Sequence, residues 1–144
     1  MKVGIDIHKC LDRFPRLFAK LSEELIDSEH EVHIITGESW ETAMKQVDDA
    51  EVLYTHHFSV IDYHIEQETL SLHQKGDGSW WTDEDVWMET KGIYAKKVGL
   101  DIHFDDHAEY APAFPRSCMF IVVPDKGLEE KLKMIMHMLK GVLN

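Results

Sequence analysis

Residues 2–7 read KVGIDI, a short apolar run that carries one acidic residue, Asp6, close to its end. The length of the run and its β-branched side chains are typical of a buried strand. Four more short strands are expected, at residues 32–36 (VHIIT), 48–54 (DDAEVLY), 100–104 (LDIHF) and 118–123 (CMFIVV). Because helical patterns alternate with these runs, the sequence predicts an α/β fold. The expected architecture is a three-layer, Rossmann-like parallel sheet of about five strands with helices on both faces.

The expected helices are marked by apolar residues at helical spacing and by residues that start or stop a helix. The first has Pro15 in its initial turn, and its apolar face holds Phe14, Phe18, Leu21 and Leu25. Three further helices are expected at residues 39–47, at about 87–97 and at 126–142. Gly99 would end the third of them.

Residues 55–87 differ from the rest of the chain, because they are rich in histidine and tryptophan. The turn Gly-Asp-Gly at residues 76–78 separates LSLHQ from SWW and is typical of a β-hairpin. We expect this segment to be a small insert or lid between the third strand and the following helix, within a single domain of residues 1–144. Three tryptophans are expected to form the insert's small core rather than a substrate pocket: Trp80, Trp81 and Trp87.

The charge balance restricts the partners of this chain. It has 144 residues, with 15 lysines and arginines against 27 acidic residues, for a formal charge of −12. Such a chain is a poor electrostatic partner for a nucleic-acid backbone or an anionic membrane. Cys10 and Cys118 are too few for a disulfide framework or a zinc cluster. With no secretory leader or membrane-length apolar run, we expect a cytoplasmic protein.

Polar residues gather where the predicted strands end. These positions hold Asp6, His8, Thr36, Gly37, Asp105 and Asp106. The carboxyl ends of parallel strands meet at one edge of a sheet, which is where such folds bind ligands. Each residue alone is more typical of a turn or a helix cap. Three converging carboxylates repel one another unless a cation joins them, and an oxygen-rich cluster suits Mg²⁺ and a phosphate group.

Three of these segments resemble motifs of the haloacid dehalogenase-like superfamily. Residues 3–12 (VGIDIHKCLD) resemble its first motif, HIITG at residues 33–37 its second, and IHFDDH at residues 102–107 its fourth. The motifs occur in the family's order, and the resemblance extends from Lys2 to about Val123. It implies a Mg²⁺-dependent phosphohydrolase that acts through an aspartyl-phosphate.

The resemblance also implies roles for the acidic residues. Asp6 would be the nucleophile that takes the phosphoryl group. The Asp6 carboxylate and the backbone carbonyl of His8 would bind Mg²⁺. Asp105 would complete the metal shell, with Asp106 assisting directly or through water.

The phosphate group would be held by residues from two other motifs. Thr36 and Gly37 would contact phosphate oxygens, and a lysine would neutralise charge on the phosphate and the nucleophile. Lys91 is the preferred candidate for that lysine, since the start of the helix before the fourth motif lies on the strand-end side of a right-handed crossover. Lys96 and Lys97 lie near the far end of that helix, where a solvated cationic pair is favoured by the helix dipole.

The sequence departs from the family pattern directly after the proposed nucleophile. His8 stands where the family's phosphatases have a second aspartate, and Lys9 stands where a small residue, often glycine, is common. His8 has three equally weighted interpretations: a substitute acid–base, a bystander that offers only its carbonyl, or the mark of a fold that has lost efficient hydrolysis.

Two functional hypotheses follow. The first is a phosphohydrolase-like enzyme acting on a small phosphate ester or a phosphorylated macromolecule. The alternative is a catalytically impaired protein that binds a metal or phosphate without efficient turnover. A response-regulator-like receiver is disfavoured, because its acidic pair precedes its phosphoryl-accepting aspartate. No oligomeric state is predicted, and His56, His57 and His107 match no metal-binding template.

Overall fold

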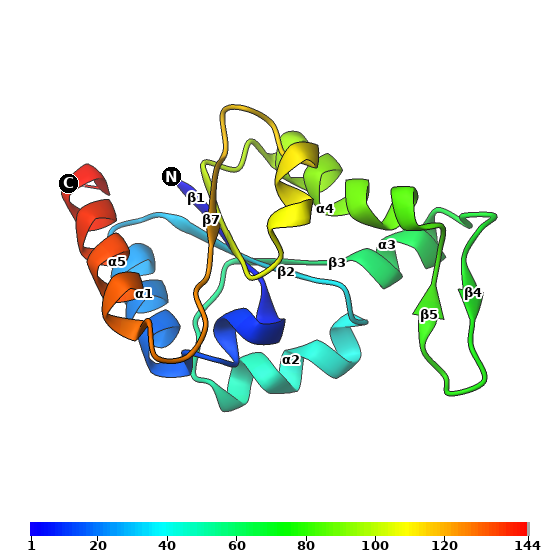
Figure 1. The fold of residues 1–144 in the computed structure, drawn as a ribbon, viewed down its shortest axis with the longest axis horizontal. Coiled ribbons are helices and arrows are strands. Elements are labelled where there is room, and N and C mark those ends of the chain that lie inside the picture. Colours follow the sequence, from blue (N-terminus) through cyan, green and yellow to red (C-terminus); the bar gives the residue numbers. More distant parts are fainter. Residues whose placement is uncertain (144) are drawn as a thin grey trace.

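A five-stranded parallel sheet lies at the centre of the structure (Figure 1). The structure is a computed structural model that describes the backbone of residues 1–143 and the side chains of residues 1–141. The strand order is β3-β2-β1-β6-β7, and each neighbouring pair is parallel. The strands are β1 (Lys2–Ile5), β2 (Glu31–Thr36), β3 (His56–Ser59), β6 (Ile102–Asp105) and β7 (Met119–Val122). The predicted α/β class and parallel sheet are confirmed.

Helices cover both faces of this sheet, as predicted. One layer contains α1 (Pro15–Asp27), α2 (Trp40–Asp49) and α5 (Glu129–Leu143). The other contains α4 (Glu84–Val98) and the short 3₁₀ helix η2 (Ala108–Ala113), with α3 (Val60–Glu66) packed beside α4. The four apolar residues expected on the first helix face are all buried in the main core. Among the described residues, no helix has the length and apolarity that a membrane crossing needs.

The third strand lies later in the chain than predicted. Residues 48–54 contain no strand, because α2 continues to Asp49 and a loop follows. The strand is instead β3, which pairs with β2 so that Thr36 lies opposite Ser59. As an edge strand with two exposed histidines, β3 lacks the apolar run that reveals a buried strand. The first part of residues 55–87 therefore belongs to the main sheet.

Helix α4 also begins earlier than predicted, at Glu84 rather than near Trp87. Asp83 occupies its N-cap, and acidic residues in the first turn favour a helix start there because they complement the helix dipole. The helix ends as predicted, since Gly99 adopts a left-handed conformation with φ of 70°. The final helix begins at Glu129, after Gly127 with φ of 98°, rather than at residue 126.

The predicted hairpin is confirmed. Strands β4 (His73–Gln74) and β5 (Trp80–Trp81) pair in antiparallel fashion, and Gly78 has the positive φ that their turn requires. The hairpin is not part of the main sheet and projects from the end of the molecule near α3 and the start of α4 (Figure 1).

The order of the strands creates the crevice in which ligands bind in folds of this type. The chain moves outward from β1 to β2 and β3, then crosses to β6 on the other side of β1. The strand order therefore reverses between β1 and β6, and such a switch point opens at the carboxyl ends of the strands. The ladder continues one residue past β1, since the Asp6 N–H donates to the Phe104 carbonyl at 2.9 Å. This bond holds Asp6 beside Asp105 at the mouth of the crevice.

Candidate functional site

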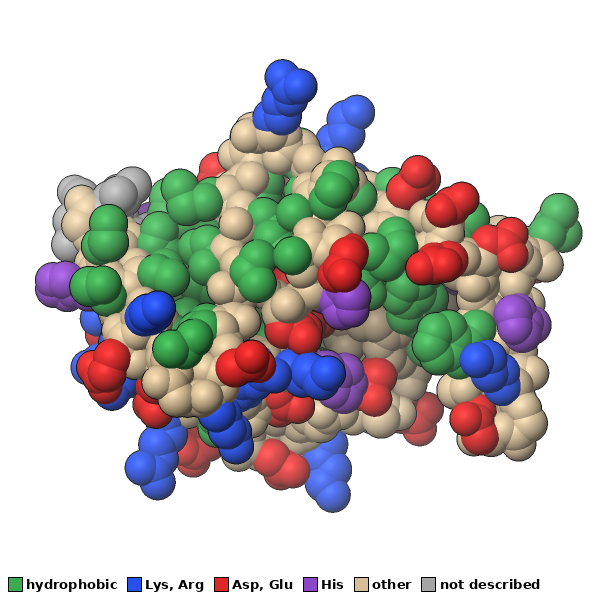
Figure 2. All heavy atoms as spheres, viewed as in Figure 1, with side chains coloured by type: hydrophobic (Ala, Val, Ile, Leu, Met, Phe, Trp, Pro, Cys, Tyr) green, Lys and Arg blue, Asp and Glu red, His purple; other side chains and the backbone are tan. Residues whose placement is uncertain are grey.

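A cavity of about 620 Å³ opens at the carboxyl ends of the strands and extends to the hairpin. Its wall includes the acidic residues that follow β1 and β6 and aromatic residues from α4, η2 and the hairpin. Figure 2 shows this side of the molecule, where acidic, histidine and hydrophobic side chains surround a hollow next to the hairpin. A polar site with an aromatic rim is therefore open to solvent.

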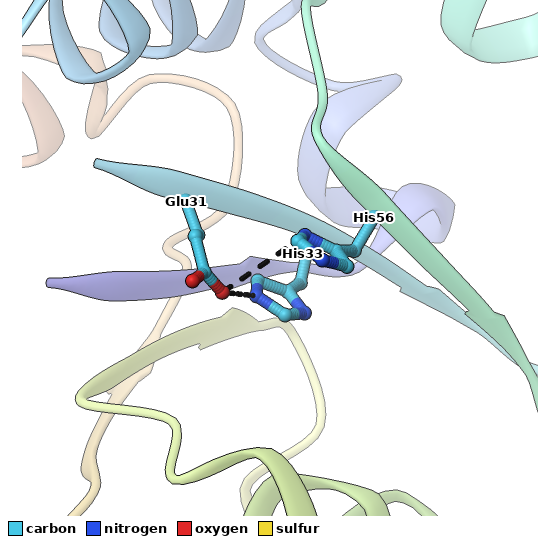
Figure 3. Close-up of side chains that lie close together, drawn as sticks. All are labelled: Glu31, His33 and His56. Carbon is cyan, nitrogen blue, oxygen red and sulfur yellow. Dashed lines mark hydrogen bonds and ion pairs between the residues drawn. The ribbon is translucent and has the colours of Figure 1, made fainter. Parts of the chain in front are cut away.

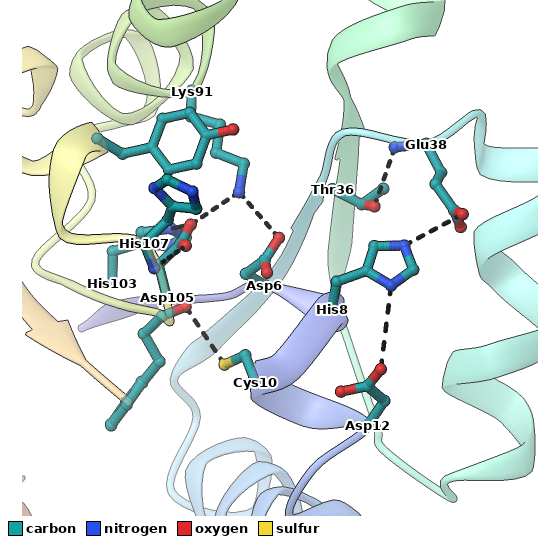
Figure 4. A network of polar contacts seen from close by, with 12 residues as sticks. Asp6, His8, Cys10, Asp12, Thr36, Glu38, Lys91, His103, Asp105 and His107 are labelled. Carbon is teal, nitrogen blue, oxygen red and sulfur yellow. Dashed lines mark hydrogen bonds and ion pairs between the residues drawn. The ribbon is translucent and has the colours of Figure 1, made fainter. Parts of the chain in front are cut away.

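A buried ion cluster lies at the inner end of this cavity (Figure 4). The Lys91 ammonium donates to Asp6 Oδ1 at 2.8 Å and to Asp105 Oδ2 at 2.7 Å. At most 6% of any of these three side chains is exposed. Among the described residues, nothing donates a hydrogen bond to Asp6 Oδ2. One oxygen of Asp6 is thus fixed by Lys91, and the other remains available on the cavity side.

The electrostatics differ between the two carboxylates. Burial raises the pKa of Asp6 to about 6, helped by the charges of Asp105 and Asp106 and opposed by Lys91. Burial also acts to raise the pKa of Asp105, but the His103 hydrogen bond and the Lys91 charge outweigh it, and the net shift is downward. The pKa of Lys91 is raised, because the two carboxylates outweigh the burial that disfavours its charge. At neutral pH the ionised forms of Asp6, Lys91 and Asp105 therefore predominate.

These residues form a donor set that fits a divalent cation. Oxygen atoms from Asp6, Asp105 and Asp106 lie within 4.8 Å of one another. Three carboxylates and one ammonium leave a formal charge of −2, which one divalent cation would balance. All three side chains offer carboxylate oxygens, and Mg²⁺ prefers oxygen ligands, whereas zinc and copper favour nitrogen and sulfur. The donor set is therefore compatible with Mg²⁺.

Asp105 is held by hydrogen bonds in addition to that from Lys91. His103 Nε2 lies 3.1 Å from Asp105 Oδ2, and the His107 backbone N–H donates to Asp105 Oδ1 at 3.0 Å. Burial lowers the pKa of His103, against the influence of Asp105, so the imidazole is neutral and donates through Nε2. These contacts fix the orientation of the carboxylate before any ligand arrives.

The segment after Asp6 is tightly bent. Within η1 (Ile7–Leu11), His8 is extended and Lys9 adopts a left-handed conformation with φ of 51°. A side chain in that conformation is strained, which is the physical reason for preferring glycine there. The bend turns the His8 imidazole toward Glu38, with Nε2 at 3.1 Å from Oε1 (Figure 4). Asp12 lies 3.9 Å from the other ring nitrogen.

Thr36 and Gly37 are both at the end of β2, but only Gly37 lines the cavity. The Thr36 side chain is fully buried, and its Oγ1 accepts a hydrogen bond from the Glu38 N–H at 3.2 Å. Gly37 leaves space for Trp87, since a Cβ on Gly37 would lie 2.9 Å from that ring. Thr36 thus stabilises the turn that positions Glu38, and the missing side chain of Gly37 lets the Trp87 ring pack against the backbone there.

Of the three candidate lysines, only Lys91 lies in the cluster. It sits in the middle of α4 rather than at its start, because the helix begins earlier than predicted. Lys96 and Lys97 occupy the exposed last turn and do not line the cavity. Gly92 lets η2 approach α4 at this level, since a Cβ there would lie 2.2 Å from the Ala113 carbonyl oxygen. This close packing brings the Tyr110 ring to within 4.5 Å of the Lys91 ammonium.

The tryptophans do not form a separate core of the insert, contrary to expectation. Trp80, Trp81 and Trp87 line the cavity, and 42% of Trp81 is exposed. The two-residue strands of the hairpin are too short to enclose three large rings. Trp87 instead donates through Nε1 to the Tyr110 hydroxyl at 3.0 Å. The aromatic residues therefore shape the site.

The other three histidines considered as metal ligands lie in different parts of the structure. His57 stacks on Trp40, with ring centroids 3.9 Å apart, and so serves packing. His107 lines the cavity and pairs with Glu109 on its exposed side. His56 lies at the amino end of β3, away from the cavity and close to Glu31 and His33.

The structure thus brings together Asp6, Lys91, Asp105 and Asp106, with His8 and Gly37 on the same cavity wall. Sequence reasoning missed Glu38, His103 and Tyr110. The histidine was visible within residues 102–107 and shares a strand face with Asp105, which is two positions later. Nothing in the sequence connects Glu38 with His8 or Tyr110 with Lys91. No family model matches the chain, and neither a curated protein nor a solved structure matches it.

Proposed function

We propose that this chain is a Mg²⁺-dependent phosphohydrolase of the haloacid dehalogenase-like type, in which Asp6 accepts the phosphoryl group. The observation that carries the proposal is the buried Lys91 ammonium between Asp6 and Asp105, next to Asp106 and open to the cavity. Burying several charges is costly, and clusters of charged groups with shifted pKa values in a cleft are characteristic of functional sites. The order of the motif residues along the chain supports the same assignment.

The charges of the cluster match the needs of phosphoryl transfer. Asp6, Asp105 and Asp106 would hold Mg²⁺, which supplies positive charge against the phosphate oxygens when bound. Lys91 keeps Asp6 Oδ1 oriented and reduces the repulsion between the carboxylate and an approaching phosphate. Phosphoryl transfer depends mainly on such positioning and charge neutralisation.

The proposed reaction has two steps. Asp6 Oδ2 attacks the phosphorus of the ester, the P–O bond to the alcohol breaks, and the alcohol oxygen takes up a proton. Water then attacks the phosphorus of the aspartyl-phosphate, which releases inorganic phosphate and restores the Asp6 carboxylate. His8 is the candidate for transferring both protons, with Glu38 orienting its imidazole. The aromatic cavity wall would bind the alcohol part of the ester.

The position of His8 also favours the second candidate, a phosphate-binding protein without efficient turnover. Its imidazole is held between Glu38 and Asp12 on the exposed wall of the cavity. If these contacts persist when a phosphate ester is bound, His8 delivers no proton and the second step is slow.

A panel of aryl, alkyl and nucleoside phosphates, assayed with and without Mg²⁺, tests the proposal. We expect Mg²⁺-dependent release of phosphate, and Asp6→Asn should lower the rate more than about 1000-fold. Asp125→Asn is the control, because Asp125 is 89% exposed and outside the cavity. Activity that survives in Asp6→Asn refutes the aspartyl-phosphate mechanism.

The two candidates are distinguished by His8→Asp. If hydrolysis by the wild-type protein is slow and this variant is faster, His8 limits the acid–base step. Binding of Mg²⁺ and phosphate by calorimetry, with no turnover in either protein, establishes the binding function instead.

A further inference from the structure

A second cluster of metal-ligating side chains lies at the edge of the sheet opposite the cavity. It consists of Glu31 and His33 on β2 and His56 at the start of β3 (Figure 3). Glu31 and His33 are two positions apart on one strand, so their side chains share a face of the sheet. His33 and His56 are paired in register on neighbouring strands. The topology therefore gathers these residues, although their spacing along the chain shows no motif.

We propose that Glu31, His33 and His56 form a Zn²⁺ site that joins edge strand β3 to β2. This site is independent of the proposed phosphohydrolase function. The potential ligand atoms of the three side chains all lie within 4.8 Å of one another. Two imidazoles and a carboxylate are a ligand set typical of zinc, whereas Mg²⁺ prefers oxygen atoms alone.

The distances are close to those that a bound ion requires. On a tetrahedral zinc ion with bonds of about 2.0–2.1 Å, two ligand atoms lie about 3.4 Å apart. Glu31 Oε2 lies 2.9 Å from His33 Nε2 and 3.9 Å from His56 Nδ1. The carboxylate therefore needs to move by only about half an ångström relative to each imidazole.

One ligand is fixed and the other two have freedom to adjust. Only 1% of the His33 side chain is exposed, against 38% of Glu31 and 51% of His56. The His56 ring now stacks on His33, with centroids 4.4 Å apart and planes 8° from parallel. It must tilt out of this stack to direct a nitrogen at the same ion, and its exposure permits that movement. The exposed side of the cluster leaves room for water as the fourth ligand.

A hydroxyl group supports the His33 imidazole from behind, since the Tyr94 oxygen lies 2.8 Å from Nδ1, the ring nitrogen that does not contact Glu31. Metal-bound histidines usually donate their second ring N–H to such a partner, which fixes the tautomer. Thr55 Oγ1 lies 2.8 Å from His56 Nδ1, the same nitrogen that lies 3.9 Å from Glu31, so the Thr55 contact must break when His56 directs Nδ1 at the ion. Within residues 1–141, Lys2 is the lysine or arginine that pairs with this cluster, 3.6 Å from Glu31 Oε2, and its exposed ion pair would give way to the metal.

The test is a Zn²⁺ titration of the chelator-treated full chain by calorimetry, with excess Mg²⁺ present to occupy the Asp6 cluster. Visible absorption of bound Co²⁺ reports whether the coordination is tetrahedral. We expect one Zn²⁺ per chain, and at least about tenfold weaker binding in His56→Ala. His73→Ala is the control, because His73 is an exposed histidine on the hairpin and distant from the cluster along the chain.

Glu31→Gln supplies a second variant that keeps the size and hydrogen bonding of the side chain. It should also weaken Zn²⁺ binding about tenfold or more, even if His56→Ala is poorly folded. Equal Zn²⁺ affinity in the wild-type protein and Glu31→Gln overturns the proposal. Loss of affinity in His73→Ala as large as in His56→Ala also overturns it, since binding would then be spread over surface histidines.

Discussion

Replacing Lys91 by methionine tests how strongly the buried cluster depends on its one ammonium. The substitution keeps the length and apolar stem of the side chain but removes the charge that lies 2.8 Å from Asp6 and 2.7 Å from Asp105. Both carboxylates then remain buried without their shared cation. Removing one partner of a buried ion pair typically costs about 3–5 kcal/mol, and we expect Lys91→Met to lose that much free energy of unfolding at pH 8.

The free energy of unfolding lost in Lys91→Met should depend on pH, and the pKa of Asp6 determines whether the loss grows or shrinks as pH rises. In the wild-type protein the pKa of Asp6 is raised from 3.8 to about 6, so this residue lowers stability as pH rises from about 4 to 6. Without Lys91, which acts to lower that pKa, it moves above 6. The variant therefore keeps losing stability above pH 6, by up to about 1.4 kcal/mol per pH unit for one proton.

Urea unfolding at pH 6, 7 and 8, followed by circular dichroism, measures this difference. Lys96→Met is the matched control, because Lys96 lies on the same helix in the exposed last turn. It should change the free energy of unfolding by no more than about 1 kcal/mol at any pH. A loss in Lys91→Met below about 1 kcal/mol at pH 8, or one that does not grow between pH 6 and 8, refutes the reasoning.

Three further predictions concern packing, backbone strain and metal binding. Gly92→Ala should destabilise the protein by about 1–3 kcal/mol in urea unfolding, because its Cβ meets the Ala113 carbonyl oxygen at 2.2 Å. Gly141→Ala is the control, because a Cβ there has no heavy atom within 4 Å, and it should be neutral or stabilising by up to about 1 kcal/mol. Equal effects of Gly92→Ala and Gly141→Ala on the free energy of unfolding would contradict the packing argument. Lys9→Gly should raise the melting temperature, since it relieves a left-handed conformation with φ of 51°; a lower melting temperature would show that the side chain offsets the strain. Mg²⁺ affinity measured by calorimetry should fall up to about tenfold per pH unit below pH 6, because Asp6 takes up a proton that the metal must displace. A Mg²⁺ affinity that does not change between pH 7 and pH 5 would exclude Asp6 as a ligand.

The parts of this fold that were predictable from sequence are those controlled by local pattern. Buried strands such as β1 and β2 are apolar runs, and the hairpin has its own turn signal at residues 76–78. Strand β3 was not predicted, because its sequence HHFS contains no apolar run. As an edge strand it pairs with one neighbour and is partly exposed, so it does not need such a run. The start of α4 was misplaced because its capping residues lie within a segment interpreted as an insert.

The site was predictable only as far as parallel topology determines it. That topology places the ends of β1 and β6 side by side and so gathers Asp6 and Asp105. The His8–Glu38 pair depends on how two loops bend, and the aromatic wall depends on packing across the cavity. The cluster of Glu31, His33 and His56 was not predicted for the same reason. Their proximity depends on the register of β3 with β2, and β3 was not recognised as a strand.

The most direct test of the central proposal is to look for a phosphoryl group on Asp6. The wild-type protein is mixed with Mg²⁺ and an aryl phosphate, quenched in acid during the first turnover, digested and analysed by mass spectrometry. The proposed function predicts one phosphoryl group on the peptide that contains Asp6, absent without Mg²⁺ and absent in Asp6→Asn. Phosphate release during that turnover with the phosphoryl group on another residue, or on none, would contradict it.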